Sequence, residues 1–250
     1  MTVTAIAKMI DHALLHPTLT DVDLENGCAL AKAYGVASVC IKPYAIHKAS
    51  QWLDGSGVKV GTVVGFPHGS NSIKMKMEET EQCCRAGAVE IDLVVNIGKV
   101  LSEDWTYVEK EIRAVYAIVK KNNGLIKVIF ENDFLPSDLF KIKLCEICND
   151  IGVDFIKTST GFGMVKDHDG KYGYRGATEH DLSLMKKHAL DLVELKASGG
   201  IRTIEELLMA RSLGATRIGT SSTKAILDAA AIKYNEEKIS FTERQLKDGY

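Results

Sequence analysis

The sequence predicts an α/β protein built as a single (β/α)8 TIM barrel, and three observations support this prediction. Short β-branched runs of about six residues alternate with longer segments of helical periodicity. Four segments, AYGVA, RAGAVE, DIGVDF and SLGATR, repeat one pattern: a helix ends at a glycine and a buried strand follows. Polar and charged residues gather at the strand ends, which is where barrel enzymes place their active sites.

Eight segments are expected to be strands, because each is short, rich in β-branched residues and bounded by turn residues. In chain order they are residues 9–14, 36–41, 58–64, 89–95, 125–131, 153–157, 192–196 and 215–219. Eight expected helices fill the gaps, at residues 21–34, 44–53, 71–86, 103–122, 137–151, 178–189, 203–213 and 221–233. This strict alternation favours parallel pairing, because each parallel connection needs a crossover segment.

Helix boundaries are expected where capping residues meet the periodic segments. The candidate N-terminal caps are Thr20 or Asp21, Asn71, Ser102, Ser137, Thr178 and Thr203. The candidate C-terminal glycines are Gly35, Gly87, Gly124, Gly152 and Gly214.

An open, doubly wound sheet would satisfy the same alternation. However, no G-x-G-x-x-G motif follows an early strand, and GSGVKVG at 55–61 precedes a strand instead. The closed barrel is therefore preferred, as one domain over residues 1–250, with an inserted loop at 163–175 and a C-terminal tail at 234–250.

Composition excludes several classes of function. The 250 residues are 46% hydrophobic and 26% charged, with a formal net charge of −2, so no basic field suggests a nucleic-acid partner. No run reaches about 18 apolar residues, so no membrane span is expected. The N-terminus lacks secretory features, and the six cysteines lie in apolar-periodic segments, so we expect reduced thiols and a cytoplasmic location.

Zinc is the alternative interpretation of the cysteines. Cys145 and Cys148, like Cys83 and Cys84, fall within expected amphipathic helices, and no histidine pair at ligand spacing accompanies them. Buried thiols are the preferred interpretation, and no metal is expected.

Charged residues inside apolar strands are the candidates for chemistry. Glu90 and Asp92 share one face of the strand at 89–95, and a buried carboxylate is costly unless it is paired. A structural salt bridge explains Glu90 as well as a functional role does. Asp92 lies deeper in the apolar run, and we interpret it as functional.

Two lysines end neighbouring strands. Lys157 follows Phe155 and Ile156, and Lys196 repeats the pattern one βα unit later. Each ammonium makes protonation of the other costlier, which lowers one pKa and yields a neutral amine able to attack a carbonyl. The alternative for Lys157 is an edge residue whose amine reaches solvent.

Glycine-rich turns predict a phosphate site. Gly199 and Gly200 follow one strand, and the segment 219–222 follows the next. Glycines let backbone N–H groups approach an anion, and a helix N-terminus favours negative charge. Thr160 and Gly161 add a third side, although tight βα turns alone would also explain these glycines.

These residues resemble those of the deoxyribose-phosphate aldolases, a family of class I aldolases. The matching stretches run in order from residue 10 to residue 222: Ile10-Asp11-His12, SVCIKP at 38–43, VGFPHG at 64–69, EIDLVVNIG at 90–98, KVIFE at 127–131, DFIKTSTGF at 154–162, KASGGIRT at 196–203 and RIGTSS at 217–222. The resemblance implies an (α/β)8 barrel that reversibly cleaves 2-deoxy-D-ribose 5-phosphate to D-glyceraldehyde 3-phosphate and acetaldehyde. It implies no metal and no cofactor, and a homodimer.

The resemblance also implies a role for each matching residue. Lys157 is similar to the Schiff-base nucleophile, Lys196 to the neighbour that lowers its pKa, and Asp92 to the carboxylate that transfers protons through water. Asp11 and Cys40 would line the pocket. The C-terminal Tyr250 would approach it as in some members of the family, and a frayed terminus is the alternative. The implied phosphate site comprises Gly161, Gly199, Gly200, Gly219, Ser221 and Ser222.

The chain departs from the family pattern at three places. About ten extra residues, within FGMVKDHDGKYGY, separate Gly161 from Arg175. They are read as a surface insertion or as a lid or oligomer contact that alters substrate choice. Ala13 and the pair Asn132-Asp133 are also unusual, and leave open another aldolase or lyase of the same chemistry, or a barrel that only binds.

Overall fold

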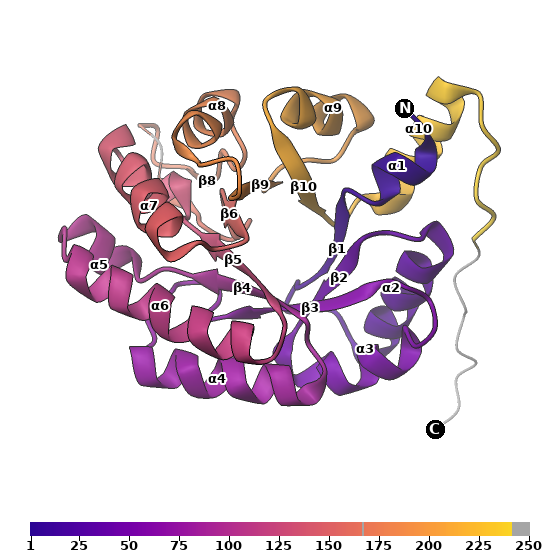
Figure 1. Ribbon diagram of the computed structural model, residues 1–250. Coiled ribbons are helices and arrows are strands. Elements are labelled where there is room, and N and C mark those ends of the chain that lie inside the picture. The colour runs from indigo at the N-terminus through magenta and orange to yellow at the C-terminus, as the bar shows by residue number, and fades with distance from the viewer. Residues whose placement is uncertain (167, 242–250) are drawn as a thin grey trace.

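Eight short, buried strands pair in parallel and close into a barrel in the computed structural model, which describes residues 1–166 and 168–241 (Figure 1). Around the barrel the order is β1-β10-β9-β6-β5-β4-β3-β2. The strands are β1 (Ile10–Leu14), β2 (Ser38–Ile41), β3 (Lys59–Val64), β4 (Glu90–Val94), β5 (Leu125–Ile129), β6 (Phe155–Lys157), β9 (Glu194–Ser198) and β10 (Ala215–Thr220). The predicted barrel is confirmed.

Strand register places charged residues of neighbouring strands side by side. Lys157 of β6 pairs with Lys196 of β9, and Asp92 of β4 pairs with Lys127 of β5. Asp11 of β1 pairs with Gly219 of β10, which closes the ring. A closed sheet thus converts residues far apart in sequence into neighbours.

Helices cover the outside of the barrel (Figure 1). They are α1 (Val3–Ala7), α2 (Asp21–Tyr34), α3 (Ile46–Trp52), α4 (Ile73–Ala86), α5 (Ile97–Leu101), α6 (Trp105–Lys121), α7 (Asp138–Ile151), α8 (Glu179–His188), α9 (Ile204–Ser212) and α10 (Thr223–Tyr234), with 3-10 turns η1 (Pro43–Ala45) and η2 (Asn132–Phe134). The inward stripe of α6 illustrates the packing: Val108, Ile112, Val115 and Val119 are all fully buried. Burying each such side chain contributes about 1.5–3 kcal/mol.

Several helix boundaries differ from the predicted ones. Ser72, and not Asn71, caps α4, and Asp104, and not Ser102, caps α6. The reason at α6 is the unpredicted helix α5, whose N-cap Asn96 accepts from the backbone of Lys99. A five-residue helix is too short to show a periodic pattern, and α1 was missed for the same reason.

Two predicted C-terminal glycines do not end their helices. Helix α6 ends at Asn122, before Gly124, and α9 ends at Leu213, before Gly214. Gly35, Gly87 and Gly152 do end theirs, each in the left-handed conformation that glycine adopts without strain.

The insertion carries secondary structure of its own. Strands β7 (Val165–Lys166) and β8 (Tyr172–Gly173) pair as a small antiparallel hairpin outside the barrel. The predicted tail begins after α10, and Tyr250 lies outside the described residues. Within 1–166 and 168–241, no helix is both long enough and apolar enough to cross a membrane.

A buried ion pair fixes the end of β4. Lys76 of α4 lies 2.7 Å from Glu111 of α6, and both side chains are inaccessible to solvent. The Lys76 ammonium also donates to the carbonyl of Val94, while Glu111 accepts from the backbone N–H of Asn96. The two helices therefore hold the residues that follow Asp92. Burial lowers the pKa of Lys76 and raises that of Glu111, so each charge depends on the other.

Removing one partner of this ion pair should destabilise the protein more than removing both partners. Glu111→Leu leaves a buried ammonium unpaired, which should cost about 3–5 kcal/mol of unfolding free energy. The double variant Lys76→Met/Glu111→Leu buries no charge and should lose less than Glu111→Leu alone. Urea unfolding of Lys76→Met, Glu111→Leu and the double variant measures the difference, and a loss in the double variant equal to the sum of the two single losses would contradict the coupling.

Candidate active site

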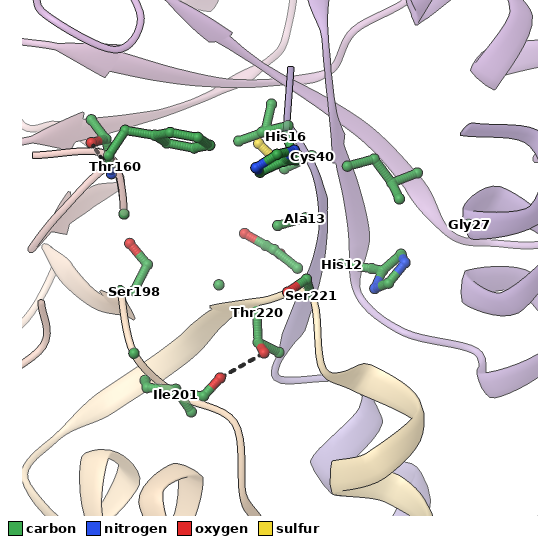
Figure 2. A pocket seen from close by; sticks show the side chains of 18 of the residues that line it. His12, Ala13, His16, Gly27, Cys40, Thr160, Ser198, Ile201, Thr220 and Ser221 are labelled. Carbon is green, nitrogen blue, oxygen red and sulfur yellow. Dashed lines mark hydrogen bonds between the residues drawn. The ribbon is translucent and has the colours of Figure 1, made fainter. Parts of the chain in front are cut away.

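A cavity of about 800 Å³ opens at the carboxyl ends of the barrel strands. Its wall includes residues from β1, β2, β6, β9 and β10, and Figure 2 shows Cys40, Thr160, Ser198 and Ser221 around it. Lys157 and Lys196 form part of the wall. The ends of the strands thus bring the predicted lysines to one solvent-connected space, as expected for a barrel.

The floor below the cavity is a network of buried charges. Among the described residues it joins three carboxylates to four cations: Asp11, Glu90, Asp92, Lys127, Lys157, Lys196 and Arg217. Charges this deeply buried are tolerated only when they are paired and hydrogen-bonded. The network therefore fixes the positions of its members.

Asp92 lies at the centre of this network. Its Oδ1 accepts from Lys127 at 2.8 Å. Its Oδ2 accepts from both Lys157, at 2.8 Å, and Lys196, at 2.7 Å. Burial by itself raises the pKa of the Asp92 carboxyl, but the three lysines, Lys127 foremost, hold it well below its usual range. Asp92 is therefore a carboxylate at neutral pH.

The three lysines differ in how many carboxylates each one contacts. Lys127 lies within 3.3 Å of Asp11, Glu90 and Asp92, and Lys196 within 2.7 Å of Asp11 and Asp92. These contacts outweigh burial and raise the pKa of both ammonium groups. In the part of the chain that the structure describes, Lys157 pairs with Asp92 alone, through an oxygen that Lys196 shares.

Because of this unequal pairing, Lys157 is the lysine of the network that most readily becomes a neutral amine. Burial lowers its pKa, Asp92 opposes that effect, and Lys196 lowers the pKa further. Loss of one proton from Lys157 also leaves three cations against the three carboxylates of the described network. A neutral amine that borders a cavity can attack a carbonyl carbon and form an imine.

Asp11 and Cys40 both line the cavity, as expected. Asp11 does more than form wall, because it contacts Lys196 at 2.6 Å and Arg217 at 2.5 Å. The Cys40 thiol lies 4.0 Å from Asp92 Oδ2. Burial, followed by the charge of Asp92, raises the pKa of this thiol to about 11, so it stays protonated at neutral pH.

Most residues of the predicted phosphate site lie together around the cavity. Thr160, Gly161, Gly199, Gly200, Gly219 and Ser221 all border the cavity. Ser222 does not border it and is the N-cap residue of α10. Gly219 has a further reason to be glycine: a Cβ there would lie 3.2 Å from Lys196 Cε and 2.8 Å from Ser198 Cβ.

Sequence reasoning missed three charged residues of this region, and it noted a fourth, Asp133, only as an unusual residue. Lys127 and Arg217 belong to the network, and Glu131 and Asp133 hold the loops above it. The sequence did carry a signal for Lys127, which is a charged residue inside the apolar run LIKVIF. The same signal, a charge within an apolar strand, identified Asp92. Arg217 gave no such signal, because β10 alternates buried and more exposed positions.

One group of residues has the spacing of metal ligands. Asp138, His180 and Asp181, on α7 and α8, have ligand atoms within 4.8 Å of one another and lie outside the cavity wall among the described residues. The ammonium of Lys141 lies 2.5 Å from Asp181 and 3.2 Å from Asp138. A cation is therefore already supplied by the chain, and the arrangement is that of a salt-bridge cluster between two helices.

Comparison with known proteins gives a consistent result. The profile of the DeoC/LacD family aldolases matches residues 5–228. A deoxyribose-phosphate aldolase of Rhodopirellula baltica is 46% identical over 237 residues, covering 95% of this chain and 94% of that protein. One from Caldicellulosiruptor saccharolyticus is 44% identical and covers 91% and 99%. The solved deoxyribose phosphate aldolase of Aeropyrum pernix, described as a tetramer, has a TM-score of 0.81, 30% identity, and coverage of 93% and 92%.

Removing Lys127 should raise the pKa of Lys157. Without its main cation, Asp92 attracts the Lys157 proton more strongly, so the neutral amine forms only at higher pH. The pH dependence of borohydride trapping with acetaldehyde reports that amine, because trapping increases as pH rises through its pKa. Lys127→Met should shift the midpoint to higher pH, and Lys127→Arg, which keeps the charge, should shift it less. Equal midpoints in all three proteins would contradict the prediction.

Proposed function

The chain belongs to the DeoC/LacD family of aldolases, and we propose that it reversibly cleaves 2-deoxy-D-ribose 5-phosphate to D-glyceraldehyde 3-phosphate and acetaldehyde through an imine on Lys157. One observation carries the assignment of the nucleophile: of the two network lysines that border the cavity, Lys157 pairs with one carboxylate among the described residues and has a lowered pKa.

The reaction begins when the neutral Lys157 amine attacks C1 of the open-chain sugar. Loss of water gives a protonated imine, which withdraws electrons from the C2–C3 bond. When the C3 hydroxyl loses its proton, this bond breaks, D-glyceraldehyde 3-phosphate leaves and an enamine remains on Lys157. Protonation of the enamine at C2 and addition of water to the imine then release acetaldehyde.

Asp92 supplies the proton transfers, and Lys196 supports it. Asp92 is ionised and contacts both lysines, so it can accept a proton from the substrate through an intervening water. Lys196 stays charged and keeps Asp92 oriented toward Lys157. It also makes protonation of Lys157 costlier.

We place the phosphate of the substrate at the glycine-rich turns of the cavity wall. Gly161, Gly199, Gly200 and Ser221 border the cavity and offer backbone and hydroxyl donors. Arg202 lies on the same wall, is exposed, and adds a positive charge that sequence reasoning did not single out.

We further infer a cytoplasmic homodimer. The support for the compartment is that all six cysteines are free thiols, five of them buried. The support for self-association is that a related aldolase, that of Aeropyrum pernix, is described as a tetramer.

The inserted hairpin provides a means of altering substrate choice. Met164 precedes β7 and Tyr174 follows β8, and both border the cavity. Phe162, just before the insertion, packs edge-on against Phe66 at 5.4 Å between ring centroids. The insertion therefore contributes apolar wall to the entrance of the site, in support of a lid over a sugar phosphate.

Replacing the nucleophile should abolish turnover. Lys157→Ala should reduce cleavage of 2-deoxy-D-ribose 5-phosphate by at least about a thousandfold, and borohydride with substrate should no longer label the protein. Lys59→Ala, at the opposite end of the barrel, should behave as wild type. A coupled assay for D-glyceraldehyde 3-phosphate, run with EDTA present, measures activity; retained trapping in Lys157→Ala, or loss of wild-type turnover in EDTA, would contradict the mechanism.

Deleting residues 164–173 should change the ratio of activities on 2-deoxy-D-ribose 5-phosphate and on 2-deoxy-D-ribose. The deletion removes the hairpin and Met164 from the cavity wall but leaves the buried network intact. Steady-state kinetics on the two sugars, with borohydride trapping to verify an intact Lys157, measure the effect. An unchanged ratio would assign the insertion to the surface.

A further inference from the structure

Two acidic residues beside the cavity have no role in the chemistry described above. Glu131 and Asp133 belong to one turn after β5 and are 1% and 9% exposed. Glu131 has a left-handed backbone, with φ of 58°, which is unfavourable for a residue other than glycine. Neither residue borders the cavity. Any effect on a ligand must therefore act through the groups that they bind.

Glu131 holds the segment that follows Lys157. Its Oε1 accepts from the backbone N–H of Thr160 at 3.1 Å, and its Oε2 accepts from the Thr160 hydroxyl. The oxygen of that hydroxyl in turn accepts from the N–H of Phe162 at 3.0 Å. Gly161 lies between these two anchored residues, so one carboxylate determines the backbone on both sides of it.

The same carboxylate lies against the start of the insertion. A Cβ at Gly163 would lie 2.8 Å from the Glu131 carboxyl carbon, so the chain passes close to it. Figure 2 shows Thr160 and Ser198 on the same side of the cavity, across from Gly27. Glu131 thus supports the wall on which the phosphate donors are proposed.

Asp133 holds the other end of the insertion. Its two carboxylate oxygens accept from the backbone N–H groups of Arg175, at 2.7 Å, and Gly176, at 3.0 Å. Gly176 packs directly on Gly199, because a Cβ at Gly176 would lie 2.3 Å from the Gly199 carbonyl oxygen. The N–H of Ala177 donates to that same oxygen at 3.1 Å.

We propose that Glu131 and Asp133 are positioning residues that fix the two sides of the phosphate site, Glu131 through Thr160 and Gly161 and Asp133 through Gly176 and Gly199. This proposal rests on the function proposed above. Both carboxylates accept from backbone or hydroxyl donors of the segments that they hold, so neither faces the cavity as an unpaired anion. Among the described residues, neither carboxylate forms a hydrogen bond or an ion pair with Lys157.

The proposal separates binding of the phosphate from chemistry at Lys157. Glu131→Ala and Asp133→Ala should each raise KM for 2-deoxy-D-ribose 5-phosphate about tenfold, since small misplacements of binding groups are costly. Values of kcat/KM for unphosphorylated 2-deoxy-D-ribose, and trapping of Lys157 with acetaldehyde and borohydride, should stay within about twofold of wild type. Binding of inorganic phosphate, measured by calorimetry, should weaken in parallel with KM.

Two further variants sharpen the test. Glu131→Gln retains an oxygen that can accept from the Thr160 N–H and should recover part of the loss. Glu103→Ala is the matched control, because Glu103 also has a left-handed backbone, with φ of 56°, but is exposed and lies away from the cavity wall. It should bind phosphate as wild type does. Thermal unfolding identifies any variant that fails to fold, and Glu131→Gln and Asp133→Asn then replace the alanine variants.

Each outcome decides between the alternatives. Equal losses on the phosphorylated and free sugars, or unchanged phosphate binding in folded Glu131→Ala and Asp133→Ala, would overturn the proposal and leave the two residues a purely structural role. If wild type binds inorganic phosphate but does not cleave 2-deoxy-D-ribose 5-phosphate, the proposed function fails, while phosphate binding by the variants still tests the positioning role. Absence of phosphate binding by wild type would overturn the positioning role directly.

Discussion

The shared carboxylate of Asp92 is the interaction on which the rest of the site depends. It accepts from Lys127, Lys157 and Lys196, which come from three other strands of the barrel. A buried carboxylate in this position keeps its charge only while those ammonium groups surround it. The ammonium groups in turn need the carboxylate, because an unpaired buried charge is costly. The closed barrel is therefore what holds these charges together.

Chemical difference between the lysines follows from unequal sharing of the carboxylates. Lys127 and Lys196 each pair with more than one carboxylate and keep their protons, whereas Lys157 shares one oxygen of Asp92 with Lys196. Burial affects all three, so it does not by itself distinguish them. The arrangement of the carboxylates does, because of the two lysines that border the cavity, Lys157 and Lys196, Lys157 contacts fewer carboxylates among the described residues.

The loops above the network are held by a second set of buried polar contacts. Lys76 and Glu111 secure the end of β4, while Glu131 and Asp133 anchor the turns after β6 and before α8. These contacts bind backbone groups, which have fixed positions along the chain, so they place loops more accurately than apolar packing alone. The insertion begins and ends at these anchors.

The sequence by itself determined the eight strands, the main helices and the set Asp92, Lys157 and Lys196, because each gives a local signal: period, capping residue, or a charge within an apolar run. Tertiary structure alone decided the pairings that make those residues chemically different. Barrel register brought Lys127 and Arg217 onto the same carboxylates, and a left-handed turn brought Glu131 to Thr160. Such contacts join residues 29 to 206 positions apart, and no local pattern encodes a distance of that kind.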